Sequence, residues 1–445
     1  MVARLFGTDG IRGVANVDLK PTLAYALGRA TAHHLAEPGG AIVVGQDTRR
    51  SGDMFVSAIA AGASSVGVDV QVVGVVPTPA LAFLARTGPF AGGIMVSASH
   101  NPADDNGLKV LDREGLKLDD AVEDHLEQLI WRAEELPGVT NAALGRVTAR
   151  ADLVEAYVEH RLGLATSIDA AGLRMVLDGA NGSGCLLGPR ILAATGAAVE
   201  VIHAEPDGVN INVRSGATDP ASLAEAVVAR GADVGFALDG DADRLIAVDA
   251  AGRIVDGDQV LGILALDRLA RGVLPGGGLV VSVLSNGGLQ DAIEAAGGQV
   301  LRTPVGDKYI LEGMQLSGAV LGGEKSGHVI VLEHTTSGDG IVTALEVLRV
   351  MARERRALAD LAARIPLLPQ QQRAVTARQR DLWESDRSFT GAVADAQGRL
   401  GPHGRILVRP SGTEPALRIM VEGPDAKVVT EVADALAVIA KERLD

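Results

Sequence analysis

Three carboxylates alternate in the stretch "DGDADR", where they belong to Asp239, Asp241 and Asp243. Like charges about 4 Å apart repel by roughly 4 kcal/mol at an effective dielectric constant of 20. The apolar stretches "VGFAL" and "LIAV" bracket this loop, which favours a divalent cation over a solvated acidic turn. A set of oxygen donors without His or Cys indicates Mg²⁺. An EF-hand is excluded because its sixth position would be Arg244 instead of Gly.

A second candidate for chemistry is the stretch "GIMVSASHNP", residues 93–102. Ser97 and Ser99 lie two residues apart, so on a strand both would face the same side. Either hydroxyl could be presented to a ligand, or both could cap a turn. Lys109 follows nearby, after "DDNG", which reads as a turn, and is one of only seven lysines in the chain. A lysine that faces solvent is the ordinary alternative.

The stretch "RPSGTEP" combines a guanidinium, two hydroxyls and a flexible backbone. Successive N–H groups in such a loop can form an anion nest, and an arginine adds a bidentate fork. This combination is typical of a phosphate site, although a Pro/Gly hairpin loop is the plain alternative. The residues concerned are Arg409, Ser411, Gly412 and Thr413, with Arg418 on the returning strand.

In "GGEKSGH", Glu324, Ser326 and His328 alternate and would face the same way if the segment is extended. Acceptors and donors placed in this way suit the hydroxyls of a sugar. A P-loop is excluded because the pattern lacks G-K-[ST]. An ordinary glycine-rich loop explains this stretch equally well, and the same holds for "FGTDGIRG", which contains Arg12.

Three segments of the chain share one plan and would position these loops. Each reads as an apolar strand, a polar loop, a helix and a second strand, and they begin at Ala41, Arg174 and Leu279. Each is followed by one more apolar strand, which leads into "SASHNP", "DGDADR" or "GGEKSGH". Loops at the carboxyl ends of such strands form the ligand crevice of α/β sheets. We therefore expect the three loops to converge on one cleft.

The last part of the chain has a different plan. "IPLLPQQQ", residues 365–372, reads as a linker, and residues 404–423 read as a strand, a tight loop and a strand, before a helix over 426–444. The predicted fold class is α/β, with three similar mixed α/β modules and a smaller C-terminal α+β domain around one central cleft. The expected domains are 1–144, 145–253, 254–366 and 367–445.

Composition limits the classes of partner. The net charge of −15 argues against nucleic acid or an anionic membrane as the main partner. Cys185 is the only cysteine, so the chain can form neither an intrachain disulfide nor a cysteine cluster for a metal. No apolar run approaches the roughly 18 residues that span a bilayer, and the start lacks a signal-peptide pattern. We therefore expect a soluble cytoplasmic protein with a small-molecule ligand.

Taken together, these loops resemble those of the α-D-phosphohexomutase superfamily. The stretches "FGTDGIRG", "SASHNP", "DGDADR", "GGEKSGH" and "RPSGTEPALRIMVEG" occur in the order of that family and span almost the whole chain. "PDGVNINVRSGATD", "VGDKY" and "TTSGDGIV" further resemble the bacterial branch that acts on glucosamine phosphates. The resemblance implies four domains around one cleft, each contributing one loop.

The resemblance also implies a role for each loop. Ser99 would carry the phosphoryl group as a phosphoserine, and one Mg²⁺ would be held by that phosphate with Asp239, Asp241 and Asp243. Arg12 and His100 would contact the phosphoserine, and Arg244 would orient carboxylates or Lys109. Lys109 and His328 are the candidates for the general base. Glu324, Ser326 and His328 would bind the sugar, while Arg409, Ser411, Gly412, Thr413 and Arg418 would hold the phosphate that is not reacting.

The expected reaction interconverts glucosamine 6-phosphate and glucosamine 1-phosphate and feeds amino-sugar and cell-wall precursors. Glucosamine 1,6-bisphosphate would be its intermediate and activator. Glucose or mannose phosphates are the alternative substrates. An aspartate-nucleophile phosphatase and a sugar-phosphate sensor without activity are the rival classes. The sequence is compatible with both a monomer and a homodimer.

Overall fold

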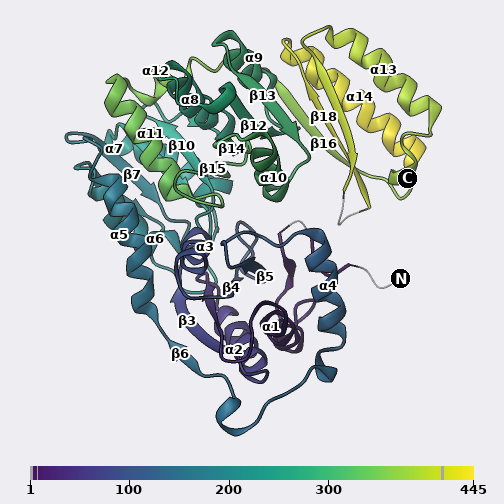
Figure 1. The fold of residues 1–445 in the computed structure, drawn as a ribbon. Coiled ribbons are helices and arrows are strands. Elements are labelled where there is room, and N and C mark those ends of the chain that lie inside the picture. The colour runs from purple at the N-terminus through teal and green to yellow at the C-terminus, as the bar shows by residue number, and fades with distance from the viewer. Residues whose placement is uncertain (1–3, 8, 412–414) are drawn as a thin grey trace. The chain divides into compact units, whose positions relative to one another are not determined.

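The computed structural model describes residues 4–7, 9–411 and 415–445. Contacts divide the chain into two compact units. The first comprises residues 1–283 and 297–364, and the second comprises residues 284–296 and 365–445. Figure 1 shows the elements of both units. In the described part of the chain, no helix has the length and apolar character needed to cross a bilayer.

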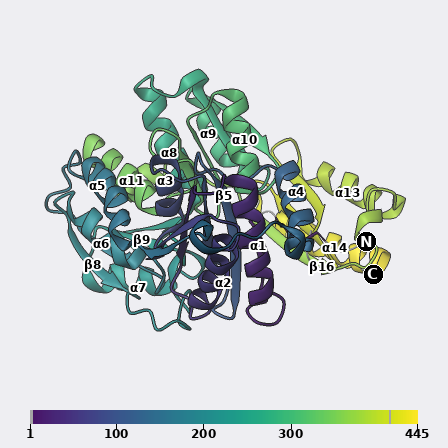
Figure 2. The same cartoon turned by 60° about the horizontal axis from the view of Figure 1, so that its bottom comes forward.

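The first module of unit one is a six-stranded mixed sheet with the order β1-β5-β4-β2-β3-β6. Strands β2, β3, β4 and β6 run parallel, whereas β5 is antiparallel to both β4 and β1. Helices α1 and α2 pack side by side (Figure 2) and cover the sheet with α4. The bounds are β1 (Ile11–Val14), α1 (Pro21–Leu35), β2 (Ala41–Gln46), α2 (Gly52–Ser64), β3 (Asp69–Val75), α3 (Thr78–Thr87), β4 (Gly92–Val96), β5 (Asp105–Asp112), α4 (Asp120–Trp131) and β6 (Val147–Ala149), with short 3-10 helices at Ala133–Glu135 and Asn141–Ala143.

The second module is a five-stranded sheet with the order β11-β10-β9-β7-β8. The parallel strands β8, β7 and β9 are followed by the antiparallel hairpin of β9 and β10. Every residue of β9 and β10 is buried, which fits sequences that are apolar throughout except for Asp249 at the end of β10. The bounds are α5 (Val154–Ala165), β7 (Arg174–Asp178), α6 (Gly184–Ala193), β8 (Ala198–Ile202), α7 (Ala221–Arg230), β9 (Val234–Leu238), β10 (Leu245–Asp249) and β11 (Ile254–Val255), with 3-10 helices at Ala151–Leu153 and Gly216–Thr218.

The third module is a four-stranded sheet with the order β13-β12-β14-β15. Asp256 and Asp339 accept backbone N–H groups at the starts of α8 and α11, which explains where these helices begin. The bounds are α8 (Gly257–Ala270), β12 (Gly278–Ser282), β13 (Gln299–Thr303), α10 (Asp307–Ser317), β14 (Leu321–Gly323), β15 (Val329–Val331), α11 (Gly340–Glu354) and α12 (Leu358–Ala362), with a 3-10 helix at Pro275–Gly277.

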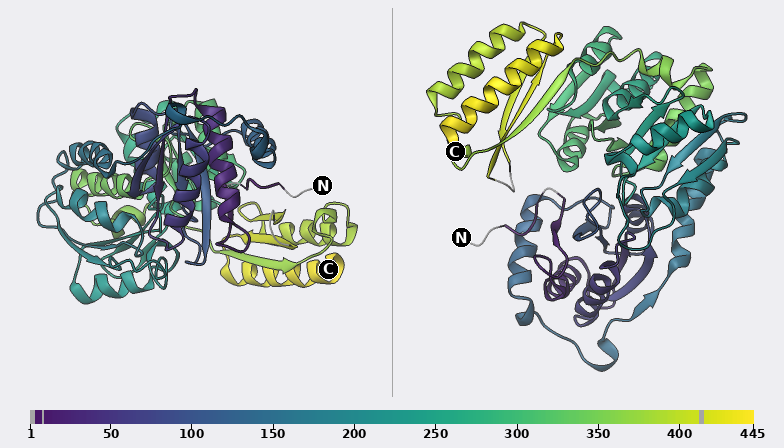
Figure 3. Two further views of the ribbon diagram at one scale, coloured as in Figure 1. Left: turned by 90° about the horizontal axis from the view of Figure 1, so that it is seen from below. Right: turned by 180° about the vertical axis from the view of Figure 1, so that it is seen from behind.

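Unit two is a small α+β domain with the antiparallel sheet β16-β18-β17. Helices α13 and α14 lie side by side and pack on this sheet (Figure 3). Asn286, the cap of α9, exchanges two hydrogen bonds of 2.8 and 2.9 Å with the backbone of Leu368. The bounds are α9 (Gly287–Ala295), β16 (Gln370–Thr376), α13 (Arg387–Leu400), β17 (Arg405–Pro410), β18 (Ala416–Glu422) and α14 (Ala426–Leu444), with a 3-10 helix at Arg380–Leu382.

The predicted fold class is confirmed: three mixed α/β modules precede a smaller α+β domain. Two local predictions were wrong. The linker over 365–372 ends earlier, because residues 370–372 pair with β18 as the start of β16. The "DDNG" stretch is not a turn throughout, because β5 already begins at Asp105 and pairs with β1 there.

Candidate active site

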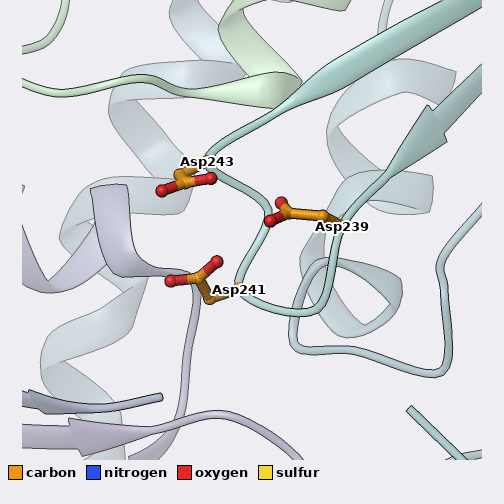
Figure 4. A group of neighbouring side chains, drawn as sticks. All are labelled: Asp239, Asp241 and Asp243. Carbon is orange, nitrogen blue, oxygen red and sulfur yellow. The ribbon is translucent and has the colours of Figure 1, made fainter. Parts of the chain in front are cut away.

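The three aspartates lie on the loop that joins β9 to β10, and their side chains point toward one another (Figure 4). One oxygen from each carboxylate lies within 4.8 Å of the others, and all three side chains are buried. The antiparallel pairing of Leu238 with Leu245 closes the loop and fixes this spacing. The sequence therefore folds three like charges into one small volume.

The donor set fits a divalent cation. Asp241 Oδ1 and Asp243 Oδ1 are buried and have no hydrogen-bond partner among the residues that the structure describes. Burial, followed by the charges of Asp243 and Asp241, raises the pKa of Asp239 well above its ordinary value. Bringing three carboxylates together without a cation is therefore unfavourable. Oxygen donors alone suit a hard ion such as Mg²⁺.

Ser99 lies directly beside these aspartates. Its Oγ donates a hydrogen bond of 2.6 Å to Asp239 Oδ2 and lies 3.2 Å from His100 Nδ1. Ser99 follows the end of β4 and has a φ of 52°, a left-handed conformation that costs a non-glycine residue about 1–2 kcal/mol. Other contacts must therefore hold the serine in place.

Ser97 is one of these contacts. Its Oγ accepts a hydrogen bond of 2.9 Å from the Ser99 amide and donates one of 2.7 Å to Asp47 Oδ2. The Ser97 side chain is wholly buried. Both hydrogen-bonding directions of this hydroxyl are thus used inside the protein, and Ser97 cannot be presented to a ligand as Ser99 is.

Arg49 fixes the backbone of the same loop. Its guanidinium donates to the Ser99 carbonyl at 2.9 Å and to the Asn101 carbonyl at 2.8 Å, and it pairs with Asp47 at 2.8 Å. Asn212 Nδ2, from the second module, donates to the same Ser99 carbonyl at 2.9 Å. The loop around Ser99 is therefore held from two modules.

Four cationic or basic side chains surround Ser99 and the aspartates. Lys109 Nζ is buried, 2.8 Å from Asp241 Oδ2 and 3.1 Å from Asp9 Oδ2. Burial lowers the pKa of Lys109, but Asp241 and Asp9 outweigh it and raise the pKa above the ordinary value. Arg12 donates to Asn101 Oδ1 at 3.0 Å.

Arg244 and His100 complete this group. The Arg244 backbone amide donates to Asp239 Oδ1 at 3.1 Å, and its guanidinium Nε lies 3.8 Å from Asp243. Burial, followed by the charges of Arg244 and Arg12, lowers the pKa of His100 to about 4. His100 is therefore neutral near pH 7.

His328 also reaches the aspartate loop. Its Nε2 accepts a hydrogen bond of 3.0 Å from the Gly338 amide, which places the ring proton on Nδ1. Nδ1 lies 3.6 Å from Asp243 Oδ2. The imidazole is thus oriented by the "TTSGDG" loop and faces the acidic loop.

The segment with Glu324 and Ser326 is not extended. The Gly327 amide donates to the Glu324 carbonyl at 3.0 Å, and Gly327 has a φ of 93°. These residues form a tight turn between β14 and β15, so alternation does not align their side chains. Glu324 Oε1 accepts from the Gly306 amide at 3.2 Å. Ser326 Oγ is buried and has no hydrogen-bond partner in the described part of the chain.

The remaining predicted site residues belong to unit two. Arg409 and Arg418 are directly opposite each other on β17 and β18 and line a cavity of about 250 Å³. Two guanidinium groups at opposed positions of neighbouring strands form a donor pair whose chemistry suits an anion. The Ser411 amide donates to the Ala416 carbonyl at 2.8 Å. Gly412 and Thr413 lie outside the described residues.

Comparisons with known proteins agree with this geometry. Models of the four phosphoglucomutase/phosphomannomutase domains match residues 3–137 (alpha/beta/alpha domain I), 155–252 (domain II), 256–367 (domain III) and 371–439 (C-terminal domain). The chain belongs to the phosphoglucomutase/phosphomannomutase family. This confirms the resemblance seen in the sequence.

Individual members of the family are similar over their whole length. The phosphoglucosamine mutase of Moorella thermoacetica is 50% identical over 442 residues, which cover 99% of both chains. That of Desulforudis audaxviator is 48% identical over 441 residues, or 98% of both chains. The crystal structure of a phosphoglucomutase/phosphomannomutase family protein from Burkholderia thailandensis superimposes with a TM-score of 0.83 at 28% identity, over 100% of this chain and 99% of that one.

Several residues around the site of this family member were not predicted from the sequence. Asp9, Arg49 and Asn212 each contact a predicted site residue, and Asp47 contacts Arg49 and Ser97. A signal for Asp47 and Arg49 was available, because "DTRR" follows β2 at the carboxyl end of a parallel strand, where ligand loops gather. For Asp9, the signal in the sequence was its place in "FGTDGIRG" near Arg12.

Proposed function

We propose that this chain interconverts glucosamine 6-phosphate and glucosamine 1-phosphate, with Ser99 as the phosphoryl carrier. The observation that carries the proposal is the Ser99 hydroxyl, which lies 2.6 Å from Asp239 in a buried cluster of three aspartates. Relatives that are 50% and 48% identical over nearly the whole chain are named phosphoglucosamine mutases, which supports the choice of sugar.

The reaction consists of two phosphoryl transfers. In the first, the bond between phosphorus and Ser99 Oγ breaks, and phosphorus bonds to the free hydroxyl oxygen of the sugar phosphate. The hydroxyl proton passes to a base, and the serine oxygen takes up a proton. In the second, the resulting glucosamine 1,6-bisphosphate is turned end for end, the bond between its other phosphorus and the sugar oxygen breaks, and that phosphorus bonds to Ser99 Oγ. The serine proton passes to a base, and the sugar oxygen takes up a proton. Such transfers depend mainly on positioning and on neutralising charge.

The site offers groups for both the positioning and the neutralisation of charge. Mg²⁺, held by Asp239, Asp241 and Asp243, would neutralise charge on the phosphoryl oxygens. Arg12, which donates to Asn101, and Arg244, which lies beside Asp243, would add positive charge at the phosphoryl group. His100, 3.2 Å from Ser99 Oγ, would be a neutral hydrogen-bonding partner.

Two predicted bases differ in their availability. His328 Nε2 is occupied by the Gly338 amide, whereas the Lys109 Nζ hydrogens face only carboxylates. Because Asp241 and Asp9 raise its pKa, Lys109 is an ammonium, which would give a proton to the departing serine oxygen and then take one up from the attacking hydroxyl. His328 would orient Asp243.

The remaining parts of the predicted site complete the proposal. Glu324 and Ser326 would bind the sugar hydroxyls, and the cavity at Arg409 and Arg418 would take the second phosphate. The four predicted domains would thus contribute one loop each. Because a charged sugar phosphate does not cross membranes unaided, the proposed substrate implies an enzyme that works in the cytoplasm.

The test is a mutase assay on protein whose Ser99 phosphate has been quantified by intact mass and peptide mapping. Glucosamine, glucose and mannose 6-phosphates are compared with Mg²⁺ present. We expect the highest kcat/KM for glucosamine 6-phosphate and no activity in Ser99→Ala. Ser57→Ala, an exposed serine on α2, is the matched control. A higher kcat/KM with glucose or mannose 6-phosphate would overturn the proposed substrate. Activity in Ser99→Ala would overturn the assignment of Ser99 as the phosphoryl carrier.

A further inference from the structure

Lys117 lies between two carboxylates that come from different modules of unit one. Its Nζ contacts Asp9 Oδ1 and lies 2.5 Å from Asp307 Oδ2. Lys117 follows β5, where a single bridge pairs it with Leu111, whereas Asp307 is the first residue of α10. Each of the three charged side chains is largely buried. Three charged groups are therefore gathered in one contact beside the site.

Asp9 uses its two carboxylate oxygens for different partners. Oδ1 contacts Lys117, whereas Oδ2 contacts the Arg12 guanidinium and lies 3.1 Å from Lys109 Nζ. The terminal torsion of an aspartate is broad, so the carboxylate turns easily unless both oxygens are held. Lys117 supplies the contact on Oδ1 that keeps Oδ2 aimed at the other two cations.

We propose that Lys117, anchored by Asp307, is a positioning residue that orients Asp9 and, through it, Lys109 and Arg12. The role rests on the proposed function, in which these two cations act at the phosphoryl group. Asp307 also balances the charge of Lys117, which would otherwise be the third cation on a single carboxylate. Removing either partner should therefore disturb the same carboxylate.

A second ion pair provides a matched control. Lys308 follows Asp307 in α10. Its Nζ donates to Asp120 Oδ1 at 2.7 Å and lies 3.8 Å from Glu123 Oε2. It joins the same two modules, but its partners lie on α4 and not in the Asp9 cluster. If Lys117 merely tied the modules together, Lys117→Met and Lys308→Met would have similar effects.

The experiment compares Lys117→Met, Asp307→Asn, their combination, Lys117→Arg and Lys308→Met in the full-length protein. For each, kcat and KM for glucosamine 6-phosphate are measured at a known Ser99 phosphate content. Crystal structures of Lys117→Met and Lys308→Met locate the Asp9 carboxylate. Asp307→Asn keeps the side-chain volume, so its kcat tests the proposal if Lys117→Met does not fold.

We expect Lys117→Met and Asp307→Asn each to lower kcat by about 10- to 100-fold, the effect of a small misplacement of catalytic groups. KM should change by less than about threefold, and the double variant should lose little more than the worse single variant. Lys117→Arg should recover most of the loss, and Lys308→Met should stay within about twofold of the wild type.

An unchanged kcat in Lys117→Met, or an equal loss in Lys308→Met, would overturn the positioning role. If the wild-type protein converts no sugar phosphate, the proposed function fails by itself, and the crystal structures then decide. An Asp9 Oδ2 that stays beside Lys109 in Lys117→Met overturns the role, whereas a rotated carboxylate supports it.

Discussion

Replacing Ser97 by alanine tests how the phosphoryl-carrying serine is held. The substitution removes the acceptor for the Ser99 amide and one of the donors to Asp47. Both groups are buried, so neither can turn to water instead. Alanine fits the space, and the change therefore removes the hydroxyl without adding volume.

The magnitude follows from the contacts that are lost. A buried N–H without an acceptor costs about 1–3 kcal/mol, and a hydrogen bond to a carboxylate contributes about 1.5–3 kcal/mol. The left-handed φ of Ser99 costs about 1–2 kcal/mol, which the Ser97 contact helps to offset. The part of this loss that falls on Ser99 is that of its orphaned amide, about 1–3 kcal/mol, since Arg49 and Asn212 still hold the Ser99 carbonyl. Each 1.36 kcal/mol lowers the rate tenfold, so we expect kcat to fall about 10- to 100-fold.

Two assays separate placement from folding. The first follows the phosphorylation of Ser99 by glucosamine 1,6-bisphosphate, read by intact mass, together with kcat and KM for glucosamine 6-phosphate. The second is thermal unfolding, with Ser57→Ala as the exposed control. We expect slower phosphorylation, a reduced kcat and a KM close to that of the wild type, because the sugar is bound by other residues. Full activity in Ser97→Ala, with Ser99 unmoved in a crystal structure, would refute this reasoning.

Three further predictions concern the metal, the loop backbone and the thiol. Asp243→Asn should weaken Mg²⁺ binding at least about tenfold by calorimetry, since Asp243 offers a free buried oxygen, and unchanged affinity would contradict the site. Arg49→Met should leave a buried Asp47 charge unpaired at a cost of about 3–5 kcal/mol, visible as faster hydrogen exchange over residues 97–106, and unaltered exchange would argue against the role of Arg49. Burial raises the pKa of Cys185 to about 11, so roughly one thiol in a thousand is ionised at pH 8. Thiol reagents should label the protein only after unfolding, and rapid labelling of native protein would disagree with this burial.

Local patterns in the sequence were enough to predict the three modules. Uniformly apolar strands such as β4 and β9 are followed by polar loops, and this contrast marks the carboxyl ends of buried strands. The loops with Ser99 and the three aspartates were found in this way, and the structure places them in contact. Spacing alone did not separate Ser97 from Ser99, because both would lie on one side of a strand. Their separation required the left-handed turn at Ser99 and the buried Asp47 beneath Ser97.

Pairing between distant strands could not be predicted from local patterns. Arg12 lies opposite Gly107 because β1 pairs with β5 in antiparallel register, which brings Asp9 to Lys109 across about a hundred residues. Arg49 and Arg50 are adjacent and chemically identical, yet Arg49 is buried at 2% exposure and Arg50 is exposed. Only the position of the neighbouring carbonyl groups decides which arginine holds the loop.

The charges of the site form two connected sets that serve different purposes. Asp239 accepts hydrogen bonds from the Ser99 hydroxyl and the Arg244 amide, whereas Asp241 shares Lys109 with Asp9. A cation bound by the three aspartates would compete with Lys109 for Asp241, and Asp9 would then be the carboxylate that keeps Lys109 near Ser99. The orientation of Asp9 therefore matters most when the metal site is occupied, which is why the contact of Lys117 with Asp9 should affect turnover more than it affects folding.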